Sequence, residues 1–253
     1  MQTITFIGNG NMALSIAQGL KANYNIEVVG RDMSKLEQFE VKLSTKIDKY
    51  LLDDFDITDK TILLCTKPNN TQEISQNLKG KAKILISILA GTTIEKLSDS
   101  FQATSIIRAM PNLASSKQAS MTTLTGDEAS KKTAISILGA IGQTRWLNSQ
   151  KELDIATALA GSGPAYLALI AEALADGAVK QGLKRDDALA ITRGLFDGFG
   201  KLIQDIHPAL LKDGVMSPGG TTAAGYGALE DSGVRAGCIN AIESAYKRAL
   251  ELG

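Results

Sequence analysis

Three hydroxyl side chains and two glycines lie together near the C-terminal end of the chain, in the run Ser217-Pro218-Gly219-Gly220-Thr221-Thr222. Glycines let successive backbone N–H groups form an anion-binding concavity, and the start of a helix adds free N–H donors. The Ser217, Thr221 and Thr222 hydroxyls can donate as well. The run therefore suits a bound carboxylate, although an ordinary capped helix with glycine turn residues has the same composition.

A second glycine-rich run, Gly8-Asn9-Gly10-Asn11-Met12, follows a short β-branched segment at the N-terminus. In a GxGxxG loop the first glycine makes a tight turn, and the second lets a pyrophosphate approach the backbone at the start of a helix. Ala13 stands in for the third glycine and is small enough for close packing of helix and strand. These residues predict a dinucleotide-binding loop, with a ligand-free glycine turn as the alternative.

Arg31, Asp32 and Ser34 follow the second β-branched run, at the point where the ribose of a dinucleotide binds. An NAD enzyme usually has an acidic residue there, whereas an arginine can pair with the 2′-phosphate of NADP. Arg31, assisted by the Ser34 hydroxyl, favours NADPH. NADH stays open as a cofactor because the Asp32 side chain can turn inward, and Arg31 as an ordinary solvated residue is the remaining alternative.

The elements that must position these residues divide the chain in two. Residues 1–150 alternate short β-branched runs with helical patterns, which is typical of parallel strands joined by helices. The strand-like runs are TITFIG, NIEVVG, TILLCTKP, AKILISILAG, TSIIRAMP, ASMTTLTG and TRWLN. This half is predicted to be a Rossmann-type α/β domain with a doubly wound parallel sheet.

Residues 151–253 have no such runs, and Ala, Gly and Leu recur there with helical spacing. The clearest helix is Pro164–Gly182, which has proline at its start and glycine at its end. Its charges, Glu172, Asp176 and Lys180, form one narrow stripe, and the other positions are mainly apolar or small. Such a helix must be buried on most sides, so we expect a second subunit to cover part of this all-helical domain.

Charge and composition exclude several classes of protein. The 253 residues contain 27 Lys and Arg against 27 Asp and Glu, so neither nucleic acid nor an anionic membrane is an expected partner. By inspection no apolar run approaches the ~20 residues that span a bilayer, and the N-terminus does not have the pattern of a signal peptide. With two cysteines and one histidine, neither a disulfide nor a metal site is expected. These features favour a cytoplasmic protein without a metal.

The chain resembles the pyrroline-5-carboxylate reductase family over nearly its whole length. The likeness rests on FIGNGNMA, on ALAGSGPAYLALIAEALADGAVKQGL and, most specifically, on HPALLKDGVMSPGGTT. The resemblance implies reduction of 1-pyrroline-5-carboxylate to L-proline with NAD(P)H, the last step of proline biosynthesis. It also implies that the helical domain forms a homodimer, and that dimers assemble further, commonly into a decamer.

The same resemblance assigns roles to individual residues. Backbone N–H groups of the run Ser217–Thr222, including those of Gly219 and Gly220, would hold the substrate carboxylate, and Thr222 would bond the ring nitrogen. Thr66, Lys67, Pro68, Ile88 and Ala90 would lie along the cofactor. A cyclic imine that carries a proton on nitrogen accepts hydride without a strong general acid, so oriented small donors suffice. Thr222 is accordingly the expected catalytic residue.

Two other functions share parts of this pattern. A β-hydroxyacid dehydrogenase or a related imine reductase has the same domain plan, but those dehydrogenases generally need a lysine on the helix that opens the second domain. The corresponding run here, GSGPAYLAL, has none. A non-catalytic NADP-binding regulatory module is the other alternative. The chain also departs from the family at Leu113-Ala114, where Thr-Pro is usual, and at Gln118-Ala119-Ser120, where a Gly-Ala-Gly is usual, which leaves the shape of the cleft wall open.

Overall fold

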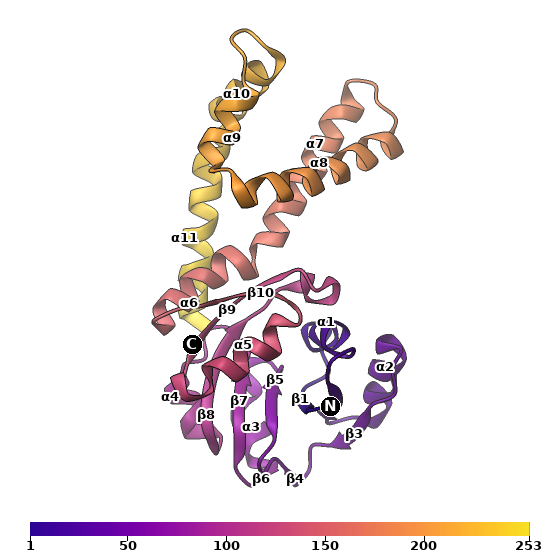
Figure 1. Cartoon of the computed structure of the whole chain (residues 1–253), viewed down its shortest axis with the longest axis vertical. Helices are drawn as coiled ribbons and strands as arrows, with labels where there is room; N and C mark the ends of the chain where they lie inside the picture. The colour runs from indigo at the N-terminus through magenta and orange to yellow at the C-terminus, as the bar shows by residue number, and fades with distance from the viewer. Residues whose placement is uncertain (253) are drawn as a thin grey trace. The chain divides into compact units, whose positions relative to one another are not determined.

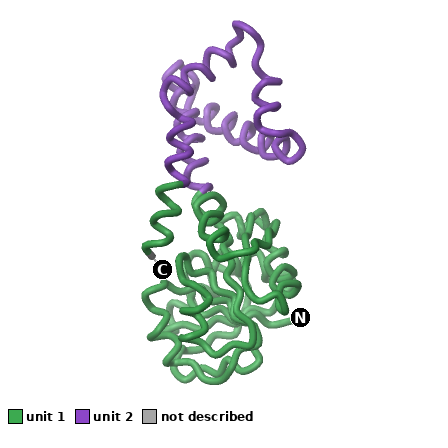
Figure 2. Tube along the Cα trace, turned by 90° about the vertical axis from the view of Figure 1, so that its left-hand side faces the viewer, with its two compact units in different colours: residues 1–162, 243–253 green, residues 163–242 purple. Residues whose placement is uncertain are grey.

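The computed structural model describes residues 1–252, and its contacts divide the chain into two compact units (Figure 2). The first comprises Met1–Ser162 together with the C-terminal residues from Glu243 onward, and the second comprises Gly163–Ile242. The chain therefore passes from the first unit to the second after Ser162, twelve residues beyond the domain boundary that the sequence predicts between residues 150 and 151. That domain boundary stays a prediction. Each unit is described by itself below.

An eight-stranded sheet forms the centre of the first unit (Figure 1). Its strand order is β10-β9-β8-β7-β5-β1-β2-β3, and a separate two-stranded sheet pairs β4 with β6. The strands are β1 Thr3–Ile7, β2 Asn25–Gly30, β3 Asp48–Leu51, β4 Phe55–Asp56, β5 Thr61–Leu64, β6 Leu78–Lys79, β7 Ala82–Ser87, β8 Ala103–Met110, β9 Ser120–Gly126 and β10 Gly142–Trp146.

Neighbouring strands from β3 to β8 are parallel, β9 runs antiparallel to β8, and β10 is parallel to β9. The chain winds outward from β1 through β2 to β3 and then resumes on the other side of β1 with β5. The prediction of a doubly wound, Rossmann-type sheet is confirmed, with an antiparallel pair at one edge as an addition. In such folds ligands bind where the strand order reverses, here between β1 and β5.

Helices cover both faces of this sheet because successive strand side chains point to opposite faces. Phe6 of β1 belongs to a core cluster with residues of α1, α2 and α5, whereas Ile7 belongs to a second cluster with residues of α3 and α4. The helices are α1 Asn11–Leu20, α2 Met33–Leu43, α3 Thr71–Gln76, α4 Ile94–Ser100, α5 Lys131–Gly139 and α6 Gln150–Ala156. Short turns η1 Pro68–Asn70, η2 Leu113–Lys117, η3 Glu128–Ser130 and η4 Thr157–Gly161 connect them.

The second unit is helical, as predicted. It contains α7 Gly163–Lys180, α8 Arg185–Asp205, α9 Pro208–Val215, α10 Thr221–Asp231 and the start of α11 Val234–Leu252. The expected stop at Gly182 is confirmed: its φ of +104° suits glycine, and the Leu183 N–H donates to the Ala178 carbonyl at 3.1 Å.

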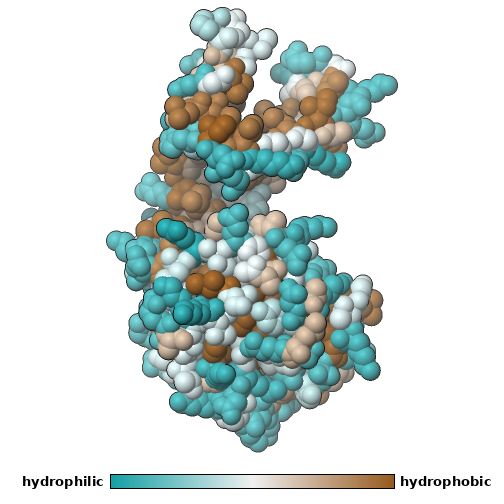
Figure 3. Space-filling view, viewed as in Figure 1, coloured by the Kyte–Doolittle hydropathy of each residue, from teal (hydrophilic) through white to brown (hydrophobic). Residues whose placement is uncertain are grey.

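Large apolar side chains are exposed on these helices, and Figure 3 shows apolar residues gathered over them. Ala175 is the one residue of α7 that is buried, while Leu169 of the same helix is 67% exposed. The helical segment Gln150–Lys180 has 31 residues and a mean hydropathy of 1.4 in its most apolar window. By length and composition it could cross a membrane, which corrects the expectation that no apolar run reaches that length.

Candidate active site

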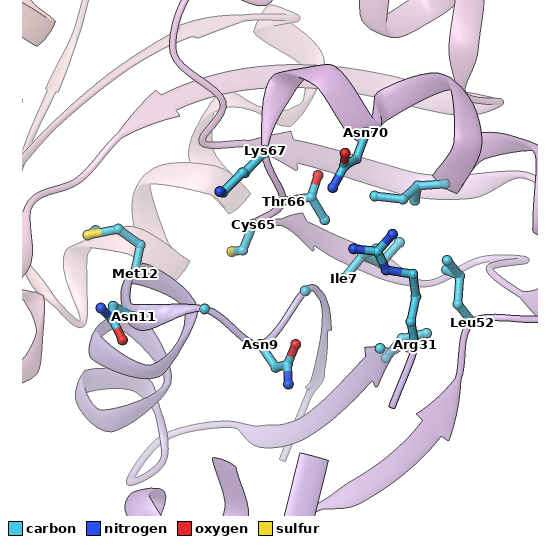
Figure 4. A pocket seen from close by; sticks show the side chains of 15 residues that line it. Ile7, Asn9, Asn11, Met12, Arg31, Leu52, Cys65, Thr66, Lys67 and Asn70 are labelled. Carbon is cyan, nitrogen blue, oxygen red and sulfur yellow. The ribbon is translucent and has the colours of Figure 1, made fainter. Parts of the chain in front are cut away.

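A cavity of about 620 Å³ opens at the carboxyl ends of β1, β2 and β5, beside the first turn of α1 (Figure 4). Eight of the residues expected to bind the cofactor line it together: Gly8, Asn9, Gly10, Asn11, Met12, Arg31, Thr66 and Lys67. Arg31 and Lys67 bring two positive charges to the lining, and none of the lining residues is acidic. The cavity therefore suits a polyanionic ligand.

The glycine-rich loop is shaped for a phosphate. Gly8 has a φ of +106°, and a Cβ there would lie 2.7 Å from the Cys65 carbonyl oxygen. Gly10 faces open space and occupies the N-cap of α1, where no side chain caps the helix. The first helical bond runs from the Leu14 N–H to the Gly10 carbonyl, so the N–H groups of the three residues between them have no acceptor within the helix. A pyrophosphate can accept these bonds.

Thr66 and Cys65 line the floor of the same cavity. The Thr66 hydroxyl oxygen is buried and has no hydrogen-bond partner, which leaves a donor available to a ligand. Burial raises the pKa of the Cys65 thiol, so this thiol stays neutral and is not a nucleophile at ordinary pH. The open cradle above Gly10 and the unpartnered Thr66 hydroxyl both fit a dinucleotide.

Beyond β2, the structure distinguishes between the two side chains that could meet the ribose. Asp32 caps α2 by accepting a hydrogen bond from the Lys35 N–H at 3.3 Å, so its carboxylate is engaged away from the cavity lining. Arg31 lines the cavity, and its Nη1 lies 3.2 Å from a carboxylate oxygen of Glu73. Ser34 is exposed in the first turn of α2 and does not line the cavity.

Three other expected cofactor contacts lie nearby without lining this cavity. Pro68 begins η1 directly after Lys67, and Ile88 and Ala90 follow β7, with the Ile88 N–H donating to the Leu64 carbonyl at 3.1 Å. Their roles, like that of Ser34, stay predictions. Sequence reasoning did not find Leu52, Asn70 and Ile74 among the lining residues, because they lie in or beside the short elements β3, η1 and α3, which carry no motif.

The run Ser217–Thr222 lies in the second unit, between α9 and α10. Gly219 has a φ of +70°, and the Gly220 N–H donates to the Ser217 carbonyl at 3.0 Å. Gly220 is the N-cap of α10, and no side chain caps this helix within the described residues. The N–H groups of Thr221 and Thr222 precede the first helical bond, made by Ala224 to Gly220. An anion-binding helix start agrees better with this geometry than a side-chain-capped helix does.

The segment that departs from the family pattern is tied to α1. The Ser15 hydroxyl donates to the Leu113 carbonyl at 2.9 Å, and the Gln118 side chain donates to the Gly19 carbonyl at 3.2 Å. Gln118 has a φ of +55°, a conformation that glycine adopts more readily. The Ser120 hydroxyl accepts from the Asn112 N–H at 3.1 Å. Where the family usually has glycines, the side chains of Gln118 and Ser120 thus form hydrogen bonds that hold this segment in place.

Two family models together match most of the chain. Residues 150–252 match pyrroline-5-carboxylate reductase dimerisation, and residues 3–91 match NADP oxidoreductase, coenzyme F420-dependent. Across residues 1–252, no group of three or more His, Cys, Asp or Glu side chains is placed to hold a metal.

Similar proteins extend this match to the whole length. The chain is 31% identical to a pyrroline-5-carboxylate reductase of Helicobacter pylori, covering 98% of this chain and 99% of that protein. The structure of the Streptococcus pyogenes 1-pyrroline-5-carboxylate reductase is 30% identical, with a TM-score of 0.86 and 98% of both chains covered. The Plasmodium falciparum pyrroline carboxylate reductase with NADP bound is 26% identical, with a TM-score of 0.82 and 99% of both chains covered. With these full-length relatives and a cavity where the strand order of its sheet reverses, the chain belongs to the pyrroline-5-carboxylate reductase family of NAD(P)H-dependent oxidoreductases.

Proposed function

We propose that this chain reduces 1-pyrroline-5-carboxylate to L-proline and that NADPH is its preferred reductant. The observation that carries the proposal is the cavity at the ends of β1, β2 and β5, with two cations and no carboxylate in its lining, in a chain of this family. In the reaction a hydride adds to the carbon of the C=N bond, and the nitrogen, which carries a proton as the iminium, becomes the amine. The reduced nicotinamide supplies the hydride when it is bound.

The first unit would hold the cofactor through backbone and side-chain donors. The free N–H groups at the start of α1 would bind the pyrophosphate, and the Thr66 hydroxyl would donate to it or to the adjoining ribose. Arg31 would pair with the 2′-phosphate, with Ser34 as a second donor. NADPH is favoured over NADH because Arg31 lines the cavity while Asp32 is occupied as a helix cap.

The second unit would hold the substrate. Backbone N–H groups of Gly220 and Thr221, at the start of α10, with those of Gly219 and the Ser217 hydroxyl, would bind the carboxylate. The Thr222 hydroxyl would hydrogen-bond the ring nitrogen and steady its proton while the carbon accepts hydride. No strong acid is needed, because the iminium is already the protonated form. The chain supplies orientation and excludes competing geometries.

A second copy of the chain would cover the exposed apolar helices. Support comes from the match of residues 150–252 to the dimerisation model and from the bare apolar faces of α7 and α8. The charged stripe of Glu172, Asp176 and Lys180 on α7 suits a helix between protein and water better than one within lipid. We accordingly propose a homodimer that assembles further, up to a decamer, acts in the cytoplasm and does not insert into a membrane.

The test is turnover of purified protein with racemic 1-pyrroline-5-carboxylate, followed by loss of the reduced nicotinamide absorbance with NADPH and, separately, with NADH. Saturable oxidation that yields L-proline, faster with NADPH, is the expected result. Reduction of NADP⁺ or NAD⁺ by a β-hydroxyacid, without any oxidation of NADPH or NADH by the imine, would favour the dehydrogenase alternative. Cofactor binding without any turnover would favour the regulatory module and overturn the proposal.

A further inference from the structure

Glu73 contacts the one arginine of the dinucleotide cavity. Its two carboxylate oxygens lie 3.2 and 3.4 Å from Nη1 of Arg31. Glu73 belongs to α3, whereas Arg31 directly follows β2. Both side chains are more than half exposed, at 59% for Arg31 and 56% for Glu73. The pair therefore lies at the rim of the cavity, where it can exchange partners with a ligand.

The neighbours of Glu73 place it beside the cavity and not merely beside Arg31. Asn70, three residues before it, and Ile74, the next residue, both line the cavity. Arg31 lies at the same end of the cavity as Asn70 and Leu52, away from Met12 and the start of α1 (Figure 4). In a doubly wound fold the pyrophosphate lies at the first helix and the adenosine ribose at the end of the second strand. Glu73 is thus next to the ribose end.

A carboxylate at this position acts in opposite directions on the two forms of the cofactor. It competes with a 2′-phosphate for the Arg31 donors, and it repels that phosphate because both are anionic. Toward an unphosphorylated ribose it is an acceptor for the 2′-hydroxyl, which is the role an acidic residue has in NAD enzymes. An exposed ion pair changes an equilibrium only a few-fold, so Arg31 can leave Glu73 at little cost.

We propose that Glu73 is a specificity-determining residue that weakens binding of the 2′-phosphorylated dinucleotide and supports binding of the unphosphorylated one. The preference of Arg31 for NADPH is thereby moderated, and the chain is set to accept both cofactors. This inference rests on the proposed dinucleotide site, and it concerns the ribose end of that site alone.

Isothermal titration calorimetry with NADP⁺ and NAD⁺ tests the proposal without any imine substrate. Glu73→Gln is expected to tighten NADP⁺ binding roughly threefold to tenfold. The same variant is expected to leave NAD⁺ binding unchanged or weaken it up to about threefold, since the amide is a weaker acceptor. The gain for NADP⁺ should shrink at high salt because the repulsion is screened.

Glu128→Gln is the matched control. Glu128 is also exposed and ion-paired, 3.2 Å from Nζ of Lys131, and its loss changes the net charge of the chain equally. Its partner Lys131 does not line the cavity, whereas Arg31, the partner of Glu73, does, so Glu128→Gln should leave both dissociation constants within about twofold. Arg31→Gln should weaken NADP⁺ far more than NAD⁺ and reduce the gain from Glu73→Gln.

The outcomes separate this inference from the proposed function. If the wild-type chain binds both dinucleotides and turns over the imine, but Glu73→Gln changes both affinities equally or neither, the specificity role is wrong while the function stands. If Glu128→Gln reproduces the effect of Glu73→Gln, the effect is one of net charge and the inference also fails. If the wild-type chain binds neither dinucleotide, the proposed function fails with it.

Discussion

At the scale of single residues, the proposed substrate site uses hydroxyl and backbone donors where many enzymes use an acid or a base. Thr222 is exposed in the first turn of α10, and the single histidine of the chain, His207, caps the start of α9, where it accepts a hydrogen bond from the Ala209 N–H. An iminium substrate explains this choice, because its proton is already in place. The proposed role of Thr222 is therefore to form a correctly placed hydrogen bond, not to supply a proton.

Thr222→Ala tests directly whether this hydrogen bond is needed. The account predicts a fall in kcat of about 10²-fold or more, because one oriented proton-handling group is lost. The dissociation constant for NADP⁺ should stay within about twofold, since Thr222 is proposed to contact the substrate and not the cofactor, and Thr222→Ser should recover most of the rate. Steady-state kinetics with calorimetric cofactor binding measures both. An alanine variant with the wild-type kcat would remove Thr222 from the mechanism.

At the scale of elements, a buried ion pair fastens α6 to the sheet. Arg108 of β8 is 1% exposed, and its Nη2 donates to an Asp154 carboxylate oxygen at 2.6 Å. Gln150 accepts from the same guanidinium at 3.2 Å and also from the Ile94 N–H at 2.7 Å, which links the start of α4 to α6. The Nε of Arg108 has no partner, so the guanidinium depends on these contacts.

Removing Asp154 leaves that guanidinium buried without its counter-charge. Asp154→Ala is therefore expected to lower the free energy of unfolding by about 3–5 kcal/mol. The exposed pair Glu128–Lys131 offers a contrast, and Glu128→Ala should cost less than about 1 kcal/mol. Chemical denaturation at equal protein concentrations compares the two. Equal losses of unfolding free energy in both variants would mean that the buried Arg108–Asp154 pair does not stabilise the packing of α6 against the sheet.

Some strands of the sheet could be predicted from the sequence, and others could not. Strands such as β1, β5 and β7 could be predicted because both of their faces are buried and their β-branched runs are continuous. β3 was missed, since an edge strand with the sequence DKYL and an exposed face has no such run. The residues of the glycine-rich loop line one cavity together, and their binding of a dinucleotide stays a prediction.

Contacts between distant side chains were not predictable in the same way. The Arg31–Glu73 and Arg108–Asp154 pairs join residues 42 and 46 positions apart, and no local pattern encodes which charge meets which. Their partners follow from the order of strands in the sheet, which periodicity does not specify. The sequence therefore predicts helices, strands and loop motifs better than it predicts which charged side chains form ion pairs.

At the scale of the whole molecule, the helical unit leaves more apolar surface uncovered than one chain can keep in water. Leu195 and Phe199 of α8 are 56% and 43% exposed, and with Leu211 of α9 they line an apolar groove. Exposed apolar surface of this kind marks an interface. The family model that matches this part of the chain is one of dimerisation, so we expect this groove to lie in the interface between subunits.

Analytical ultracentrifugation tests the assembly. The wild-type chain should sediment at no less than twice its 26.8 kDa, and at larger multiples if dimers associate further. Leu195→Glu should dissociate the assembly or shift it toward smaller species, because it places a charge in the apolar groove. Val41→Glu, at a 76% exposed apolar position of α2, is the control and should sediment like wild type. A monomeric wild-type chain would contradict the interface.

The central claim is that this chain moves hydride from a bound nicotinamide to the imine carbon of 1-pyrroline-5-carboxylate, and isotope transfer measures that step directly. Two samples of NADPH, each deuterated at a different face of C4, are mixed separately with the enzyme and the imine. The proline from each is analysed by mass spectrometry and NMR. The account predicts deuterium at C5 of L-proline from one of the two C4 faces. Proline without deuterium from either face, or no proline at all, would contradict it.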